Sequence, residues 1–177
     1  MDKDVYCQKE LFVAQVDKDD NIIGPVERWL THKNGILHRG FTLVMIYQNN
    51  FVLQQRKHLA FDKTLDLTSS SHQVFKNGDL QSDDEAIYEM LSREWNLSKN
   101  DLKEGLTKKG SVYYKAKDPN SAFTEHEIDY VYSAKLKRLP EPNPDYAYGY
   151  ELTNAPKKFL AKNTPAPWVE KIINLIL

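Results

Sequence analysis

The segment formed by residues 124–132 constrains the fold most strongly, because acidic and apolar side chains alternate along it. Its second half is rich in β-branched and aromatic residues, which is typical of a strand. Successive side chains of a strand point to opposite faces, so Glu125, Glu127 and Asp129 share one face. Two carboxylates on one face can share a cation or divide acid and base roles. Alone, however, the alternation favours an ordinary sheet face that is exposed to water.

The rest of the chain predicts strands and a few helices in a single domain, residues 1–177. Ser82 as N-cap with Glu85 three residues later forms a capping box, which predicts the start of a helix. That helix runs to about Trp95 and stops near Asn96. The order of strands, helix, strands and two helices is typical of an α+β or layered α/β fold. Strands are predicted at 41–47, 51–56, 65–72 and 112–114, a hairpin at about 11–26, and C-terminal helices at about 155–177.

Composition limits the partners of this chain. Lysine and arginine total 24 against 25 aspartates and glutamates, so an anionic ligand needs a local basic cluster. The single cysteine, Cys7, excludes an internal disulfide and suits a reducing compartment. The charged N-terminus precedes no long apolar run, and the apolar run at 172–177 is too short to span a membrane. We therefore expect a cytoplasmic protein with neither a membrane nor a nucleic-acid partner; the sequence leaves its oligomeric state open.

Histidine is scarce, with five in the chain, and three of these lie near predicted strands. Each histidine alone is more typical of a surface or hydrogen-bonded side chain than of a metal ligand. Three imidazoles and two carboxylates together suit Zn²⁺, Mn²⁺, iron or Mg²⁺ at higher coordination better than a tetrahedral cysteine site does. Sequence spacing alone does not bring such a set together. The residues that could form it are His32, His38, His72, Glu125 and Glu127.

Several motifs follow one another in a characteristic order from about residue 11 onward. The two most specific are the pattern H-x5-HR that begins at His32 and the run EHEIDY at 125–130. In this order the motifs resemble those of type 1 isopentenyl-diphosphate isomerases, which belong to the Nudix superfamily. The resemblance implies a Nudix fold, a mixed sheet flanked by helices. Further motifs that carry it are LQQR at 53–56, TSSSH at 68–72, EWNL at 94–97 and PW at 167–168.

The resemblance also implies roles for individual residues. Those implied to bind a divalent metal, which is Mg²⁺ or in its place Zn²⁺ or Mn²⁺, are His32, His38, His72, Glu125 and Glu127. Those implied to act on the hydrocarbon are Glu127 as acid or base, Ser70, Tyr114 beside the acid/base group, and Trp168, whose ring face can stabilise a carbocation. Those implied to hold a Mg²⁺-bound small-molecule diphosphate are Arg28, Arg56, Glu94 and, as the nearest candidate for a second lysine, Lys63.

One departure from the family affects the chemistry directly. Ser70 stands where the family has its catalytic cysteine. A thiol with a pKa of about 8.5 exchanges protons readily, whereas a serine hydroxyl is far more weakly acidic. Met90 also stands where a diphosphate-contacting arginine is expected. We therefore expect metal-dependent isomerisation between isopentenyl and dimethylallyl diphosphate, at reduced activity.

Two other functions stay open. A Nudix hydrolase of a nucleoside or prenyl diphosphate needs several metal-binding carboxylates on one helix. In the corresponding run at 89–97 only Glu94 remains of the expected three. Isomerases of the family also lack that set, so its loss favours the isomerase branch. The other alternative is a non-catalytic diphosphate-binding module that has kept the metal ligands and lost the thiol.

Overall fold

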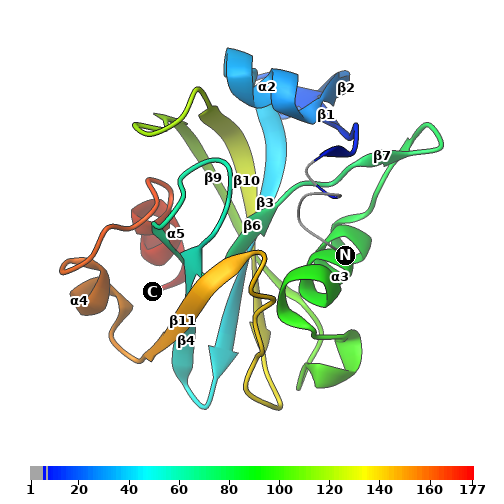
Figure 1. Ribbon diagram of the computed structural model, residues 1–177. Helices are drawn as coiled ribbons and strands as arrows, with labels where there is room; N and C mark the ends of the chain where they lie inside the picture. Colours follow the sequence, from blue (N-terminus) through cyan, green and yellow to red (C-terminus); the bar gives the residue numbers. More distant parts are fainter. Residues whose placement is uncertain (1–5, 7) are drawn as a thin grey trace.

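The computed structural model describes Tyr6 and residues 8–177; Cys7 lies outside the described residues. A mixed sheet is covered on one face by α3 (Asp83–Trp95) and on the other by α5 (Val169–Ile176) and the short α4 (Pro156–Leu160) (Figure 1). The helix α2 (Arg28–Asn34) lies at one end of the sheet (Figure 1). This arrangement confirms the predicted α+β class with a sheet flanked by helices.

The strand β3 (His38–Tyr47) organises the sheet. It runs parallel to β10 (Thr124–Lys135) and antiparallel to β1 (Phe12–Val16), β4 (Asn50–Arg56) and β6 (Ser69–Ser71). Outside these strands, β9 (Thr107–Lys117) pairs with β10, β2 (Ile22–Glu27) with β1, and both β11 (Ala147–Thr153) and β5 (Leu65–Asp66) with β4. A separate pair is formed by β7 (Phe75–Lys76) and β8 (Asp79–Leu80), and the 3-10 turn η1 (Lys99–Asp101) follows α3.

Two apolar cores lie on the two faces of the sheet. On one face, Phe41 and Leu43 of β3 pack with the apolar side of α3. On the other face, Val44 belongs to a core that includes Trp168 and residues of α4 and α5. Both faces of β3 are therefore buried, as its near-continuous apolar run predicts.

The helix α3 begins and ends where the sequence predicts. The Ser82 hydroxyl accepts the backbone N–H of Glu85, and the Glu85 carboxylate accepts the backbone N–H of Ser82, which completes the capping box. Asn96 adopts a left-handed conformation with φ of 50° and stops the helix. In the described part of the chain, neither α3 nor any other helix is long and apolar enough to cross a membrane.

The sequence pattern does not predict α2 or β11. The helix α2 has only seven residues, and its N-cap is Glu27, whose carboxylate accepts the N–H groups of Trp29 and Leu30. Glutamate is not among the residues preferred at an N-cap, so this start carries no familiar signal. The strand β11 follows a proline-rich connector and is buried only at its first residue, although Tyr148, Tyr150 and Leu152 alternate along it.

The acidic face of β10 is buried, which corrects the expectation of a sheet face exposed to water. Glu125, Glu127 and Asp129 are 6%, 4% and 0% exposed. A buried carboxylate is costly unless it is paired, hydrogen-bonded or bound to a metal. The groups that compensate these carboxylates therefore define the site.

Candidate metal centre and adjoining cavity

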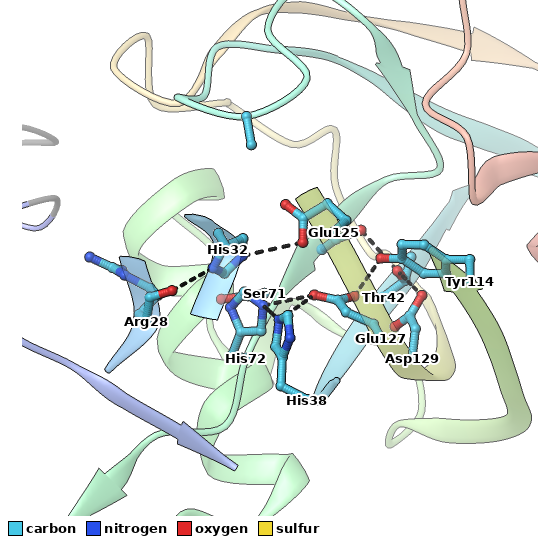
Figure 2. Close-up of polar contacts among 12 residues, drawn as sticks. Arg28, His32, His38, Thr42, Ser71, His72, Tyr114, Glu125, Glu127 and Asp129 are labelled. Atoms are coloured by element: carbon cyan, nitrogen blue, oxygen red, sulfur yellow. Dashed lines mark hydrogen bonds and ion pairs between the residues drawn. The ribbon is translucent and has the colours of Figure 1, made fainter. Parts of the chain in front are cut away.

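Three histidines from different parts of the chain and two glutamates of β10 converge at one place (Figure 2). The parallel pairing of β10 with β3 places Glu127 opposite His38, the first residue of β3. One ligand atom from each of the five residues lies within 4.8 Å of all the others. The structure thus brings together the whole set that the sequence suggests: His32 of α2, His38 of β3, His72 just after β6, and Glu125 and Glu127 of β10.

Backbone carbonyls orient two of the imidazoles. Nδ1 of His32 lies 2.6 Å from the carbonyl oxygen of Arg28, and Nδ1 of His38 lies 2.8 Å from that of Ile36. A carbonyl only accepts, so each ring donates through Nδ1 and leaves Nε2 free of its hydrogen in the neutral form. Histidine ligands of metals usually donate their second ring nitrogen in this way.

The Nε2 atoms point toward the carboxylates. Nε2 of His32 lies 3.2 Å from Oε2 of Glu125, and Nε2 of His38 lies 3.1 Å from Oε1 of Glu127. Nε2 of His72 lies 2.8 Å from the same Glu127 oxygen and 3.2 Å from Nε2 of His38. Nitrogen and carboxylate donors at these separations fit a divalent cation between them. A bound metal would supply positive charge that anchors Glu127 and its neighbours.

Burial and charge set the protonation of this cluster. Burial disfavours the charged form of His32, but the carboxylate of Glu125 beside it outweighs burial and raises the pKa of His32 to about 9. Burial lowers the pKa of His72 despite its contact with Glu127. Burial also opposes ionisation of Glu127, yet the hydrogen bonds with His38 and His72 hold its pKa well below the usual range. Glu127 is therefore an anion, as a metal-binding carboxylate must be.

Gly40 of β3 makes room for this anion. A Cβ atom at Gly40 would lie 2.6 Å from Oε2 of Glu127 and 2.8 Å from its Cδ. Every other residue type would therefore displace the Glu127 carboxylate. The requirement for glycine at this position comes from the neighbouring strand.

Tyr114 and Trp168 extend from Glu127 along one wall of the cavity. The Tyr114 hydroxyl donates to Oε2 of Glu127, and the Tyr114 and Trp168 rings stack with centroids 5.3 Å apart at 24°. Burial, together with the nearby carboxylates, raises the pKa of Tyr114 well above its usual value. Tyr114 therefore keeps its proton and holds it at Glu127, while Trp168 presents an aromatic ring to the same cavity.

Ser70 belongs to a hydrogen-bonded chain on another wall. Its Oγ lies 2.8 Å from Oγ1 of Thr42 and donates to Oδ2 of Asp66 at 3.0 Å. Thr42 in turn donates to Asp129 at 2.8 Å (Figure 2). Burial and the charge of Glu127 raise the pKa of Asp129 well above its usual value. The Ser70 hydroxyl is thus held by its neighbours.

The cavity beside the cluster is lined by arginines as well as carboxylates. Arg28, Arg56 and Arg93 all line it together with Glu94. Arg93 donates to Oε1 of Glu94 at 2.6 Å. Among the described residues, neither the Nε–H of Arg56 nor that of Arg93 has a hydrogen-bond partner, although both are buried. Buried guanidinium groups with spare donors suit a phosphate or diphosphate.

The structure places all but one of the other predicted site residues at the cavity. Ser70, Tyr114, Trp168, Arg28, Arg56 and Glu94 all line the cavity. Lys63 is exposed and is not among the lining residues, so the structure does not bring it to the site. Arg93 lies there instead, one helical turn after Met90, the position where an arginine was expected. The sequence signal that could have identified Arg93 was its position next to Glu94, a predicted site residue. Sequence reasoning also missed further lining residues: Tyr6, Trp29, His58 and Tyr146.

Solved structures with a similar fold define the class of the fold. A protein of Deinococcus radiodurans matches with a TM-score of 0.69 at 16% identity, over 94% of this chain and 99% of that one. A MutT Nudix hydrolase from Burkholderia pseudomallei matches with a TM-score of 0.54 at 16% identity, over 80% of this chain and 98% of that one. The fold is therefore of the Nudix type, as predicted.

Sequence relatives narrow the class to a family. "Isopentenyl-diphosphate Delta-isomerase 2" of Photorhabdus laumondii is 30% identical over 165 residues, which cover 90% of this chain and 88% of the relative. "Isopentenyl-diphosphate Delta-isomerase 1" of Mesocricetus auratus is 27% identical over 186 residues, 92% of this chain and 80% of the relative. No protein-family model matches the chain. The chain belongs to the isopentenyl-diphosphate Delta-isomerase family, and it is an isopentenyl-diphosphate isomerase-like Nudix protein.

Proposed function

We propose that this protein interconverts isopentenyl and dimethylallyl diphosphate with a divalent metal bound at the cluster. The observation that supports this most directly is the link from the metal cluster through Glu127 and Tyr114 to Trp168. This link places the Tyr114 hydroxyl, which holds its proton toward Glu127, and the aromatic ring of Trp168 in the same cavity. Membership of the isomerase family agrees with it.

The reaction adds one proton to the substrate and removes another from it. Protonation of the terminal alkene carbon gives a tertiary cation, and loss of a proton from the neighbouring carbon gives the allylic isomer, so atoms and charge balance. Glu127 with Tyr114 is the acid/base pair of one step. The Trp168 ring face stabilises the intermediate cation.

The diphosphate binds at the basic side of the cavity. The Nε–H groups of Arg56 and Arg93, which lack partners within the described chain, donate to its oxygens. Glu94 lies beside Arg93 and is the carboxylate available for a Mg²⁺ on the diphosphate. The cluster metal is Mg²⁺, Zn²⁺ or Mn²⁺, all of which accept imidazole and carboxylate ligands.

Ser70 limits the rate. Its hydroxyl is a far weaker acid than a thiol, so proton exchange on its side of the substrate is slow. The test is product formation from isopentenyl diphosphate with Mg²⁺ by purified wild-type protein and by Ser70→Cys. The proposal expects slow turnover by the wild type and faster turnover by the variant. If neither forms the allylic product, the isomerase assignment is wrong.

The metal requires a separate test, since binding does not depend on turnover. Metal content of the purified protein is measured before and after Glu125→Ala. A stoichiometric divalent ion that is lost in the variant supports the ligand set. An equal metal content in both proteins contradicts it.

Ser70 also favours a second candidate function, a diphosphate-binding module without turnover, because its hydroxyl is hydrogen-bonded to Thr42 and Asp66. That candidate predicts thermal stabilisation by dimethylallyl diphosphate, with no product from either the wild type or Ser70→Cys.

Hydrolysis has less support. Glu94 is the only carboxylate of α3 among the residues that line this cavity, while Glu89 is paired with Lys76 outside it. Phosphate release from a panel of nucleoside and prenyl diphosphates would show hydrolysis.

A further inference from the structure

Asp66 is a buried carboxylate to which the sequence assigns no role. It lies on the short strand β5, and its side chain is 0% exposed. It is not among the residues that line the cavity, so it does not reach a bound ligand. Any influence on a ligand must therefore act through its neighbours.

Three of those neighbours do line the cavity. Oδ2 of Asp66 accepts from Nη1 of Arg56 at 2.6 Å and from Oγ of Ser70 at 3.0 Å. Oδ1 accepts from Nε1 of Trp168 at 2.9 Å and from the backbone N–H of Leu67 at 2.8 Å. One carboxylate thus joins a guanidinium at the anion-binding side, the aromatic ring at the hydrocarbon side and the hydroxyl at the position of the family's cysteine.

We propose that Asp66 is a positioning residue that fixes the separation between the diphosphate end and the hydrocarbon end of the cavity. Its two oxygens divide the task, because Oδ2 holds Arg56 and Oδ1 holds Trp168. The guanidinium carbon of Arg56 lies 5.0 Å from the centroid of the Trp168 ring, which is the spacing that Asp66 maintains. This inference rests on the proposed function, since it assumes a ligand with a diphosphate and a short hydrocarbon.

The chemistry of the carboxylate agrees with positioning rather than proton transfer. Four donors already occupy its two oxygens, and three of them, the guanidinium, the indole and the backbone N–H of Leu67, only donate. A neutral amide offers one accepting oxygen and a donating nitrogen, so it cannot serve both sides. With its oxygen toward Trp168 and Leu67, its NH₂ group faces Arg56 and repels it.

Two substitutions separate the two sides of Asp66. Asp66→Asn keeps the acceptor for Trp168 and loses the one for Arg56, whereas Asp66→Ala loses both. Dissociation constants are measured with Mg²⁺ for inorganic pyrophosphate, which has no hydrocarbon, and for dimethylallyl diphosphate. Asp101→Asn is the matched control. Asp101 is a carboxylate that also accepts from an arginine, Arg138, and from Ser98, neither of which lines the cavity.

Both Asp66 variants are expected to weaken pyrophosphate binding by about tenfold, since Arg56 loses a charged partner that orients it. For dimethylallyl diphosphate, Asp66→Ala is expected to lose about threefold more than Asp66→Asn, because only the alanine variant frees the ring. Asp101→Asn is expected to bind both ligands as the wild type does. Pyrophosphate affinity within about twofold of wild type in both Asp66 variants, or equal losses for both ligands in Asp66→Ala, overturns the proposal.

A further variant keeps the test valid if neither Asp66 variant folds, as judged by circular dichroism. Trp168→Phe keeps a ring beneath Arg56 but has no N–H for Oδ1 of Asp66. The proposal expects weaker pyrophosphate binding in this variant, although pyrophosphate has no hydrocarbon to contact the ring; unchanged binding refutes it. These readouts need no turnover. A protein that binds pyrophosphate through Asp66 but forms no allylic product rejects the proposed isomerisation and leaves the positioning role standing.

Discussion

Two walls of the same cavity differ in where their polar side chains point. On the β10 wall, His32, His72 and Glu127 direct their ligand atoms toward one point and leave those atoms close to one another. On the Ser70 wall, Ser70 and the buried Asp66 behind it direct their polar atoms at their own neighbours, so their hydrogen bonds form a chain. The first wall is arranged to hold something that is not part of the chain, and the second to hold the chain itself. This difference explains why we expect metal binding to be intact and turnover to be slow.

The largest effect is expected from Glu127→Gln, which changes the carboxylate of the β10 wall that contacts both His38 and His72. The amide loses the charge that faces His38 and His72 and, with it, the acid/base role that we propose for Glu127 beside Tyr114. We expect a loss of about a thousandfold in kcat together with loss of bound metal. Isomerisation assays and metal analysis measure the two effects.

His126→Gln is the matched control for Glu127→Gln. His126 precedes Glu127 on the same strand, but its ring contacts the Gly35 carbonyl and Tyr113 outside the cluster. It should keep both metal and activity. A Glu127→Gln protein with wild-type metal content and kcat would show that the cluster is not the site.

Gly40→Ala tests the same wall without touching a ligand. The added methyl group would lie 2.6 Å from Oε2 of Glu127, so the carboxylate must move. We expect metal affinity to fall by about 10- to 100-fold with the fold retained, as for other changes in the groups that orient a ligand. Metal titration by calorimetry measures this effect. Gly105→Ala is the control, because a Cβ there meets nothing within 4 Å; equal affinities in the two variants would contradict the close approach.

Ser70→Cys sharpens the comparison from the other wall. A thiol at this position restores an exchangeable proton, and we expect kcat to rise by about tenfold or more while metal affinity stays unchanged. Steady-state kinetics with isopentenyl diphosphate measure it. Ser71→Cys, which places a thiol one residue away on the cavity lining, should give no gain. A similar gain from both variants would mean that the exact position of the thiol is unimportant.

The smallest effect is expected from Ser82→Ala, which changes neither wall. It removes the hydroxyl that accepts the N–H of Glu85 at the start of α3. We expect a loss of about 1 kcal/mol in the free energy of unfolding, measured by urea denaturation. Metal affinity and kcat should match the wild type. A change in either would show that the position of α3 controls the site.

Most residues of the β10 wall could be predicted from the sequence. Histidines are few, and the alternating acidic residues of β10 place Glu125 and Glu127 on one face in any strand. The parallel register that sets Glu127 beside His38 is a long-range property, so the motif order of the family was needed to predict their meeting. The steric requirement for glycine at position 40 could not be predicted, because it depends on that register.

The Ser70 wall was far less predictable. Serine, threonine and aspartate are common residues, and Asp66 has no distinguishing neighbours in the sequence. Its contact with Trp168 joins positions 102 residues apart. The placement of Lys63 illustrates the same limit: the sequence suggested a second diphosphate-binding cation, and only the fold put Arg93 at the cavity and Lys63 at the surface.

One measurement tests the central claim most directly: proton NMR of isopentenyl diphosphate incubated in D₂O with Mg²⁺ and the wild-type, Ser70→Cys or Glu127→Gln protein. Each cycle of protonation and deprotonation exchanges solvent deuterium into the substrate and forms the allylic isomer. Slow exchange with allylic product in the wild type, faster exchange in Ser70→Cys and none in Glu127→Gln is the predicted result. Neither exchange nor product in metal-loaded wild-type and Ser70→Cys proteins would contradict it.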